Sequence, residues 1–93
     1  HLKTAGDRAA YIEAALEDGD VSLITHALGD VARAAGMSDV ARQAGVTREG
    51  LYKALSEKGD PRLSTLLGVM RALGLQLSVR AADAEKPADT AAA

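Results

Sequence analysis

The chain has 93 residues and a mass of 9.6 kDa, which fits one domain and excludes a two-domain enzyme. Apolar residues make up 47% of the sequence and aromatic residues only 2%, so we expect a small core of Ala, Leu, Val and Ile, which favours packed helices over a β-sandwich. Cysteine is absent, and no apolar run reaches the roughly 18 residues of a membrane span. The sequence therefore predicts a cytoplasmic protein with no disulfide and no membrane contact.

The formal net charge of −2 is the sum of three regions whose net charges alternate in sign. Residues 1–36 carry a net charge of −3, residues 37–80 carry +3, and residues 81–93 carry −2. The overall pI of about 5.6 argues against nucleic acid, but the middle region has the charge that a phosphate backbone attracts. We predict acidic helices in residues 1–36, a functional region in 37–80 that forms one compact domain with 7–36, and a disordered Ala-rich tail in 81–93.

Two helices are predicted in the acidic region. The first covers residues 7–18, ends at Gly19, and places three apolar side chains on one face, Ile12, Ala15 and Leu16. The second begins after Asp20, a good N-cap residue, and ends at Gly36, which can adopt the left-handed conformation that closes a helix. Apolar residues recur in it at spacings of three and four, which indicates one buried face: Val21, Ile24, Leu28, Val31 and Ala35.

Two shorter helices are predicted at the start of the basic region. Ser38 can cap a helix that runs to Ala44, and Thr47 can cap another that runs to about Glu57. Gly45 separates them, so the two helices must meet at a steep angle. The residues Lys-Gly-Asp-Pro at 58–61 then form a turn.

A last helix and a strand complete the basic region. The helix opens at Pro61 or Arg62, stops at Gly74, and has five apolar residues predicted to face inward: Leu63, Leu66, Leu67, Met70 and Leu73. After it, apolar residues alternate with polar ones, which is the period of a strand: Leu75, Leu77 and Val79. Because one chain offers this strand no partner, we expect it to pair with a second copy and form a homodimer.

Residues 38–55 have the pattern of a helix-turn-helix. Such a motif needs a small residue where the helices cross, a turn residue that tolerates positive φ, and an apolar residue about one and a half turns into the second helix. Ala41, Gly45 and Leu51 meet these three needs. A helical hairpin with a glycine turn would show the same triplet, but the segregated positive charge favours a DNA-binding motif.

From Leu16 to Val79 the chain resembles the HigA-like addiction module antidote proteins, within the lambda-repressor-like, Xre-type helix-turn-helix group. The resemblance lies in LEDGD at 16–20, ALGDVARAAGM at 27–37, AGVTREGLYKALS at 44–56 and GDPRLSTLLGVMRALGLQLSV at 59–79. It implies a five-helix, all-α fold and a dimeric, operator-binding antitoxin. It also implies a partner, a small RelE/HigB-like toxin that cleaves mRNA. Gly50 departs from many relatives, which carry a residue better suited to a helix.

If the second helix of the motif enters a major groove, its first residues reach base edges. Arg48 can bond guanine through two donors and is the best candidate for base reading. Glu49 can accept from cytosine or be held by a neighbouring cation, and the Tyr52 hydroxyl can reach DNA or the ring can pack on the hairpin. Thr47 and Lys53 share that face, while other candidates at element ends hold phosphate or are ordinary surface residues: Ser38, Gln43, Lys58 and Arg62.

The acidic first helix is the predicted toxin-binding surface. A toxin that cleaves RNA needs a basic working face, and a helix that carries acids beside an apolar stripe can match it. The residues concerned are Ile12, Glu13, Leu16 and Glu17. The acidic tail is the weaker candidate, because ordering it on binding would cost conformational entropy.

The sequence does not point to catalysis, a cofactor or a metal. His26 has no second histidine or cysteine near it in the sequence, so we interpret it as a structural residue. No acid–base pair or Gly-rich phosphate loop is enforced by spacing. The leading hypothesis is a DNA-binding antitoxin that represses its own operon; the alternatives are a stand-alone Xre-type regulator and an adaptor whose motif no longer binds DNA.

Overall fold

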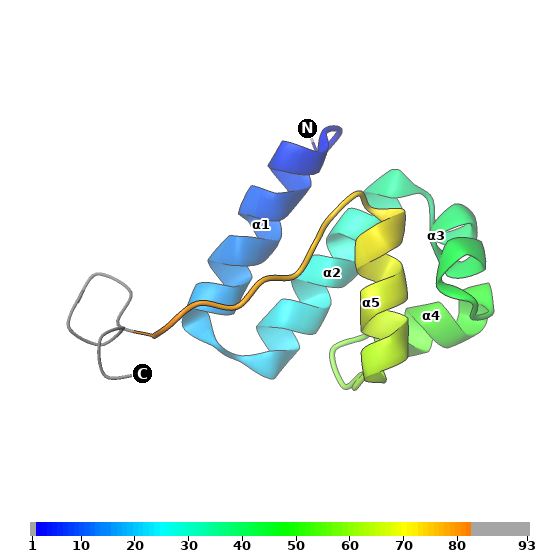
Figure 1. Ribbon diagram of the computed structural model, residues 1–93. Helices are drawn as coiled ribbons and strands as arrows, with labels where there is room; N and C mark the ends of the chain where they lie inside the picture. Colours follow the sequence, from blue (N-terminus) through cyan, green and yellow to red (C-terminus); the bar gives the residue numbers. More distant parts are fainter. Residues whose placement is uncertain (1, 83–93) are drawn as a thin grey trace.

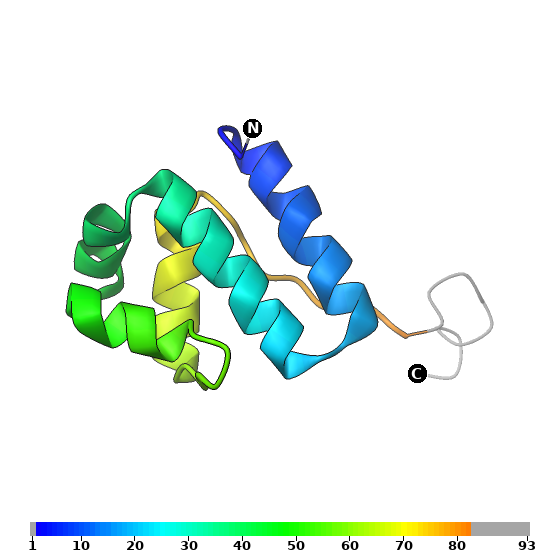
Figure 2. The same ribbon diagram turned by 180° about the vertical axis from the view of Figure 1, so that it is seen from behind.

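The computed structural model describes residues 2–82, which form five helices (Figure 1). They are α1 (Ala5–Asp18), α2 (Val21–Ala35), α3 (Met37–Ala44), α4 (Arg48–Ala54) and α5 (Leu63–Ala72). The predicted all-α class is confirmed. Helices α1 and α2 pack together at one end of the molecule, and α3 and α4 lie at the other end with α5 beside them (Figure 1, Figure 2). The predicted disordered tail lies, from residue 83 onward, outside the described residues.

Polar side chains fix where α1 and α2 begin. Thr4 caps α1 by accepting from the Asp7 backbone N–H at 3.0 Å, and the Asp7 carboxylate accepts from the Thr4 N–H at 3.4 Å. This reciprocal capping box satisfies donors that would otherwise lack partners, and it starts α1 two residues before the predicted residue 7. Asp20 caps α2 as predicted, through the Ser22 N–H at 2.9 Å.

The short helices α3 and α4 differ from prediction at one boundary each. Helix α3 begins at Met37, not after Ser38, because Gly36 turns the chain with a φ of 108° and Met37 is already buried. No side chain caps α3. Helix α4 begins after Thr47 as predicted but ends at Ala54, and a turn rather than helix continues to Glu57.

The core is built from aliphatic and Met side chains of all five helices. Its largest fully buried members are Leu28, Leu51, Leu73, Val31, Val40 and Val69. Two of the leucines predicted to face inward from the last helix do not: Leu63 is 68% exposed and Leu67 is 37% exposed. These two leucines are four residues apart and lie on the same flank of α5, beyond the surface that the rest of the fold covers, so this flank faces solvent. None of the helices in residues 2–82 combines the length and the apolar character that a membrane crossing requires.

After α5 the chain reverses at Gly74 and runs back toward α1 (Figure 1). The Leu75 N–H donates to the Met70 carbonyl at 2.8 Å, and the Leu75 side chain packs against the core. Within residues 2–82 no strand forms. The strand predicted for Leu75, Leu77 and Val79 is therefore absent from the single chain, because a lone extended segment has no ladder to join. Its pairing with a second copy stays a prediction.

Candidate functional sites

A tight turn joins α3 to α4. Gly45 has a φ of 76°, in the left-handed region where a side chain is unfavourable, and the Val46 N–H donates to the Ala41 carbonyl at 3.0 Å. Ala41 is 2% exposed and Leu51 is wholly buried. The three residues that the sequence pattern singled out therefore lie at the crossing, at the turn and in the core beneath it.

Helix α5 supports this pair from behind. A Cβ added to Gly68 would lie 2.9 Å from the Ala44 Cα and 3.1 Å from its Cβ. Only a residue without a side chain permits so close an approach. The contact fixes how α3 sits on α5.

Thr47 has a structural role at the start of α4. Its hydroxyl accepts from the Gly50 N–H at 2.9 Å, and a Cβ added to Gly50 would lie at the same distance from that hydroxyl. This short contact explains the unexpected glycine, because a larger residue there would push against the N-cap. The same bond means that the Thr47 hydroxyl is already engaged within the chain.

Arg48 and Tyr52 form one unit on the exposed side of α4. The Arg48 guanidinium carbon lies 5.4 Å from the centre of the Tyr52 ring, a cation–π distance. Both residues line a hollow of about 490 Å³, together with residues of α2 and the start of α3: Arg33, Gly36, Met37, Ser38 and Asp39. Tyr52 thus packs on Arg48 and is still 41% exposed. The ring can therefore pack on the hairpin while the hydroxyl stays free to reach DNA.

Arg33 is a cation that the sequence reasoning missed at this end. It was counted with the acidic front of the chain, but α2 ends at the hollow that Arg48 lines. Its guanidinium lies 2.6 Å from the Asp30 carboxylate. The signal that could have found it is its place in the last turn of α2, directly before the turn at Gly36.

Most of the predicted DNA-contacting side chains lie on the surface around α3 and α4. Ser38 and Gln43 are on α3, Glu49 and Lys53 on α4, Lys58 in the following turn, and Arg62 at the N-cap of α5; all are exposed. Among residues 2–82, the ion pairs leave four of the cations here without a carboxylate within 4.0 Å: Arg48, Lys53, Lys58 and Arg62. Three carboxylates of the same segment, Glu49, Glu57 and Asp60, also form no ion pair within residues 2–82, so its net positive charge is small.

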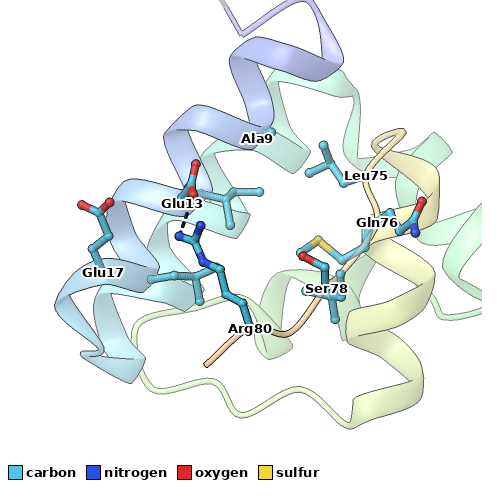
Figure 3. Close-up of a pocket in the computed structure, with 11 residues that line it drawn as sticks. Ala9, Glu13, Glu17, Leu75, Gln76, Ser78 and Arg80 are labelled. Atoms are coloured by element: carbon cyan, nitrogen blue, oxygen red, sulfur yellow. Dashed lines mark ion pairs between the residues drawn. The ribbon is translucent and has the colours of Figure 1, made fainter. Parts of the chain in front are cut away.

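A second hollow lies at the opposite end, between α1 and residues 75–80 (Figure 3). Its volume is about 480 Å³, and Ile12, Glu13, Leu16 and Glu17 of α1 all line it. Ile12 is only 3% exposed and belongs to the core, whereas Leu16 is 47% exposed. Of the residues predicted to bind a toxin, Ile12 thus forms the floor and the other three form the accessible wall.

Residues predicted to bind the toxin and residues predicted to form the dimer both line this hollow. Leu75 and Leu77 line the wall opposite α1, while Val79 is 97% exposed. Arg80 reaches across, with its guanidinium 3.7 Å from the Glu13 carboxylate (Figure 3). We name this hollow the α1 groove.

Polar contacts hold α1 to the rest of the fold. The Tyr11 hydroxyl donates to the Asp30 carboxylate at 2.6 Å, and Arg8 donates to the Leu73 carbonyl at 3.1 Å. The hydrogen bond from Tyr11, with help from Arg33, holds the Asp30 pKa below its usual value, and the same bond raises the Tyr11 pKa. His26 lies on the surface of α2, where its Nε2 is 3.4 Å from the Asp30 carboxylate; its interpretation as a structural residue stays a prediction.

No cluster of three or more His, Cys, Asp or Glu side chains suited to a metal ion occurs among residues 2–82. Two separate surfaces stand out in the described part of the chain: the hollow that Arg48 and Tyr52 line at the α3–α4 end, and the α1 groove with its two glutamates.

Comparisons with known proteins give the family. The family model for a probable addiction module antidote protein matches residues 1–81, so the chain belongs to that family. A relative from Haemophilus influenzae, described as an uncharacterized protein, is 48% identical over 80 residues, which cover 86% of this chain and 82% of the relative. No solved structure matches the chain. As an antidote, the protein has a toxin as partner.

Proposed function

We propose that this antidote is a HigA-like antitoxin that binds operator DNA through α3 and α4 and represses its own operon. The observation that carries the proposal is the α3–α4 unit: two short helices with Ala41 at the crossing, Gly45 in the left-handed turn and Leu51 buried beneath. These features are the ones a lambda-repressor-like helix-turn-helix needs. A repressor must meet its operator, so the proposal places the protein in the cytoplasm.

In this proposal α4 is the recognition helix. Arg48 reads guanine, held in position by stacking on Tyr52 at 5.4 Å. Thr47 supports the start of the helix, Glu49 and Lys53 border it, and phosphates are held by residues at the flanking element ends: Ser38, Gln43, Lys58 and Arg62. The four cations that form no ion pair within residues 2–82 supply the attraction to the DNA backbone.

The test separates base reading from phosphate contact. Arg48→Ala should weaken operator binding by about 1–3 kcal/mol per half-site and relax base preference. Lys58→Ala should weaken binding to all sequences alike and reduce the salt slope by about one unit. Gel-shift titrations on the upstream DNA and on random DNA at several salt concentrations measure both. If Arg48→Ala lowered the affinity for operator and random DNA equally, the proposal that Arg48 reads bases would be wrong.

The toxin proposed as partner is RelE/HigB-like, and the antidote itself performs no catalysis. Its acidic helix α1 is proposed to bind the basic face that such a toxin presents to RNA. Glu13 and Glu17 stand on the groove wall beside Leu16, so charge and apolar contact are available on one surface.

A homodimer is proposed to form through residues 75–79. Leu77 and Val79 are exposed, and no ladder within residues 2–82 uses their backbone. Antiparallel pairing of two copies would place the two α4 helices about 34 Å apart, one turn of DNA. Mass measurement by analytical ultracentrifugation at micromolar concentration should give twice the chain mass; a monomer both free and on DNA would overturn this.

A stand-alone Xre-type regulator is the alternative, since the basic surface alone would serve it. The neighbouring gene distinguishes this regulator from the proposed antitoxin. If a small basic protein is encoded beside this chain and copurifies with it, the antitoxin proposal is supported, whereas a regulator without a toxin would have no such partner.

A further inference from the structure

Residues 76–80 are weakly held across the α1 groove. Leu75 is anchored by its backbone bond to Met70 and by the core, but beyond it no backbone hydrogen bond joins the segment to the rest of residues 2–82. Besides the partial burial of Leu77, which is 40% exposed, the polar contact that holds the segment is the ion pair between Arg80 and Glu13 at 3.7 Å (Figure 3). Both side chains are largely exposed, at 79% and 62%, and exposed pairs of this kind are weak.

The groove has a definite chemistry. Leu16 and Met70 give it an apolar surface, and Glu13 and Glu17 give it an acidic rim on α1. Glu17 has no cation within 4.0 Å among residues 2–82. The chain's own Arg80 is the cation that lies on this rim, so the molecule displays the kind of side chain that the rim attracts.

We propose that the α1 groove receives a segment of the toxin that carries basic side chains beside apolar ones, and that Arg80 occupies the place of one of those cations in the free antidote. The toxin segment would displace Arg80 from Glu13 and pair with both glutamates. This proposal rests on the proposed antitoxin function and adds to it an internal competitor for the toxin site.

Charge favours a basic partner over a second copy of this chain. A second copy approaching through the same groove would bring its own Glu13, Glu17 and Asp18 toward the acidic rim, and like charges repel. A basic segment would form a favourable ion pair at each glutamate. Dimerisation through residues 75–79 uses the backbone edge of the segment and leaves the α1 wall to the toxin.

The experiment is a calorimetric titration of the full chain with the toxin encoded beside its gene. Arg80→Ala should tighten binding about two- to fivefold, which is the range one exposed ion pair supplies. Glu17→Lys should weaken it about three- to tenfold at low salt, with a smaller effect at high salt. Leu16→Glu should weaken it at least tenfold. Glu57→Lys, the same charge change at an exposed residue of the turn after α4 that does not line the groove, is the matched control and should stay within twofold of the unaltered chain.

The tightening by Arg80→Ala is the decisive result, because loss of a merely structural contact would weaken binding or leave it unchanged. If Arg80→Ala and Glu17→Lys both match the control while the toxin still binds the unaltered chain, the groove proposal is overturned and the antitoxin function stands. If the toxin does not bind the unaltered chain, the proposed function itself fails. If Arg80→Ala changes only the oligomeric mass, a second copy occupies the groove and the proposal is wrong.

Discussion

The two ends of this molecule are built in different ways. At the α3–α4 end, fully buried side chains and a close contact between Gly68 and Ala44 leave little room for adjustment. At the α1 end, Ile12 and Ala15 are the only buried residues of a helix 14 residues long, and hydrogen bonds from Tyr11 and Arg8 supply much of the remaining attachment.

This difference suits the partners proposed for the two ends. Reading a base edge needs a side chain held to a fraction of an ångström, which a densely packed support provides. Binding a protein segment in a groove tolerates, and sometimes needs, a wall that can shift. Rigidity in a domain of this size is therefore local.

The largest effect should follow from truncating the core of the α3–α4 end. Leu51 is wholly buried, so Leu51→Ala should lower the free energy of unfolding by about 2–5 kcal/mol. Leu16→Ala, at a half-exposed position of the α1 end, should change it by less than about 0.5 kcal/mol. Urea unfolding followed by circular dichroism measures both, and equal losses would remove the distinction between the ends.

Adding one methyl group should have opposite effects at the two ends. Gly68→Ala should destabilise by about 1–3 kcal/mol, because the new Cβ would meet the Ala44 backbone at 2.9 Å. Gly6→Ala in α1 should stabilise by about 0.4–1 kcal/mol, because its nearest neighbour is the Thr4 hydroxyl at 3.8 Å. Thermal unfolding of the two variants measures whether their changes in stability have opposite signs. A neutral Gly68→Ala would mean that α3 and α5 can separate freely.

The smallest effect concerns pH at the α1 end. Because the folded Asp30 pKa is lowered, its contribution to stability is complete above the unfolded value of about 3.9 and is lost as the pH falls through the folded value. Tyr11→Phe removes the main cause of that lowering, so the variant should lose less stability than the unaltered protein on acidification below about pH 4. Melting curves across that range test this, and parallel curves would contradict the role of Tyr11.

Much of the fold could be predicted from the sequence, because apolar periodicity and capping residues act locally. The limits of α2 at Asp20 and Gly36 are confirmed, and Leu28 and Val31 are buried as predicted, but Val21 at the start of the predicted buried face is 62% exposed. The exposure of Leu63 and Leu67 could not be predicted, because periodicity gives the direction of an apolar face but not how much of it another element covers. The early start of α1 was open to prediction, since Thr4 and Asp7 have capping-box spacing, but the apolar pattern that defined the helix begins later.

For the candidate surfaces too, the sequence predicts what lies within one short segment but not which distant segments the fold brings together. The positions of Ala41, Gly45 and Leu51 follow from a motif contained in one contiguous stretch of chain, residues 38–55. The α1 groove joins Glu13 to Arg80, and no local pattern relates residues so far apart. Arg33 was assigned to the acidic region because charge was summed along the chain, whereas the fold brings it beside Arg48.

The two tyrosines give each end its own spectroscopic reporter. The sequence holds no tryptophan and only Tyr11 and Tyr52, one hydrogen-bonded to a carboxylate beside α1 and the other beneath a guanidinium on α4. Their ultraviolet absorption and fluorescence therefore belong to two distinct environments. A Tyr52→Phe chain would report only on the environment near α1, and a Tyr11→Phe chain only on that at α4, so the unfolding of the two ends could be followed separately without an added dye.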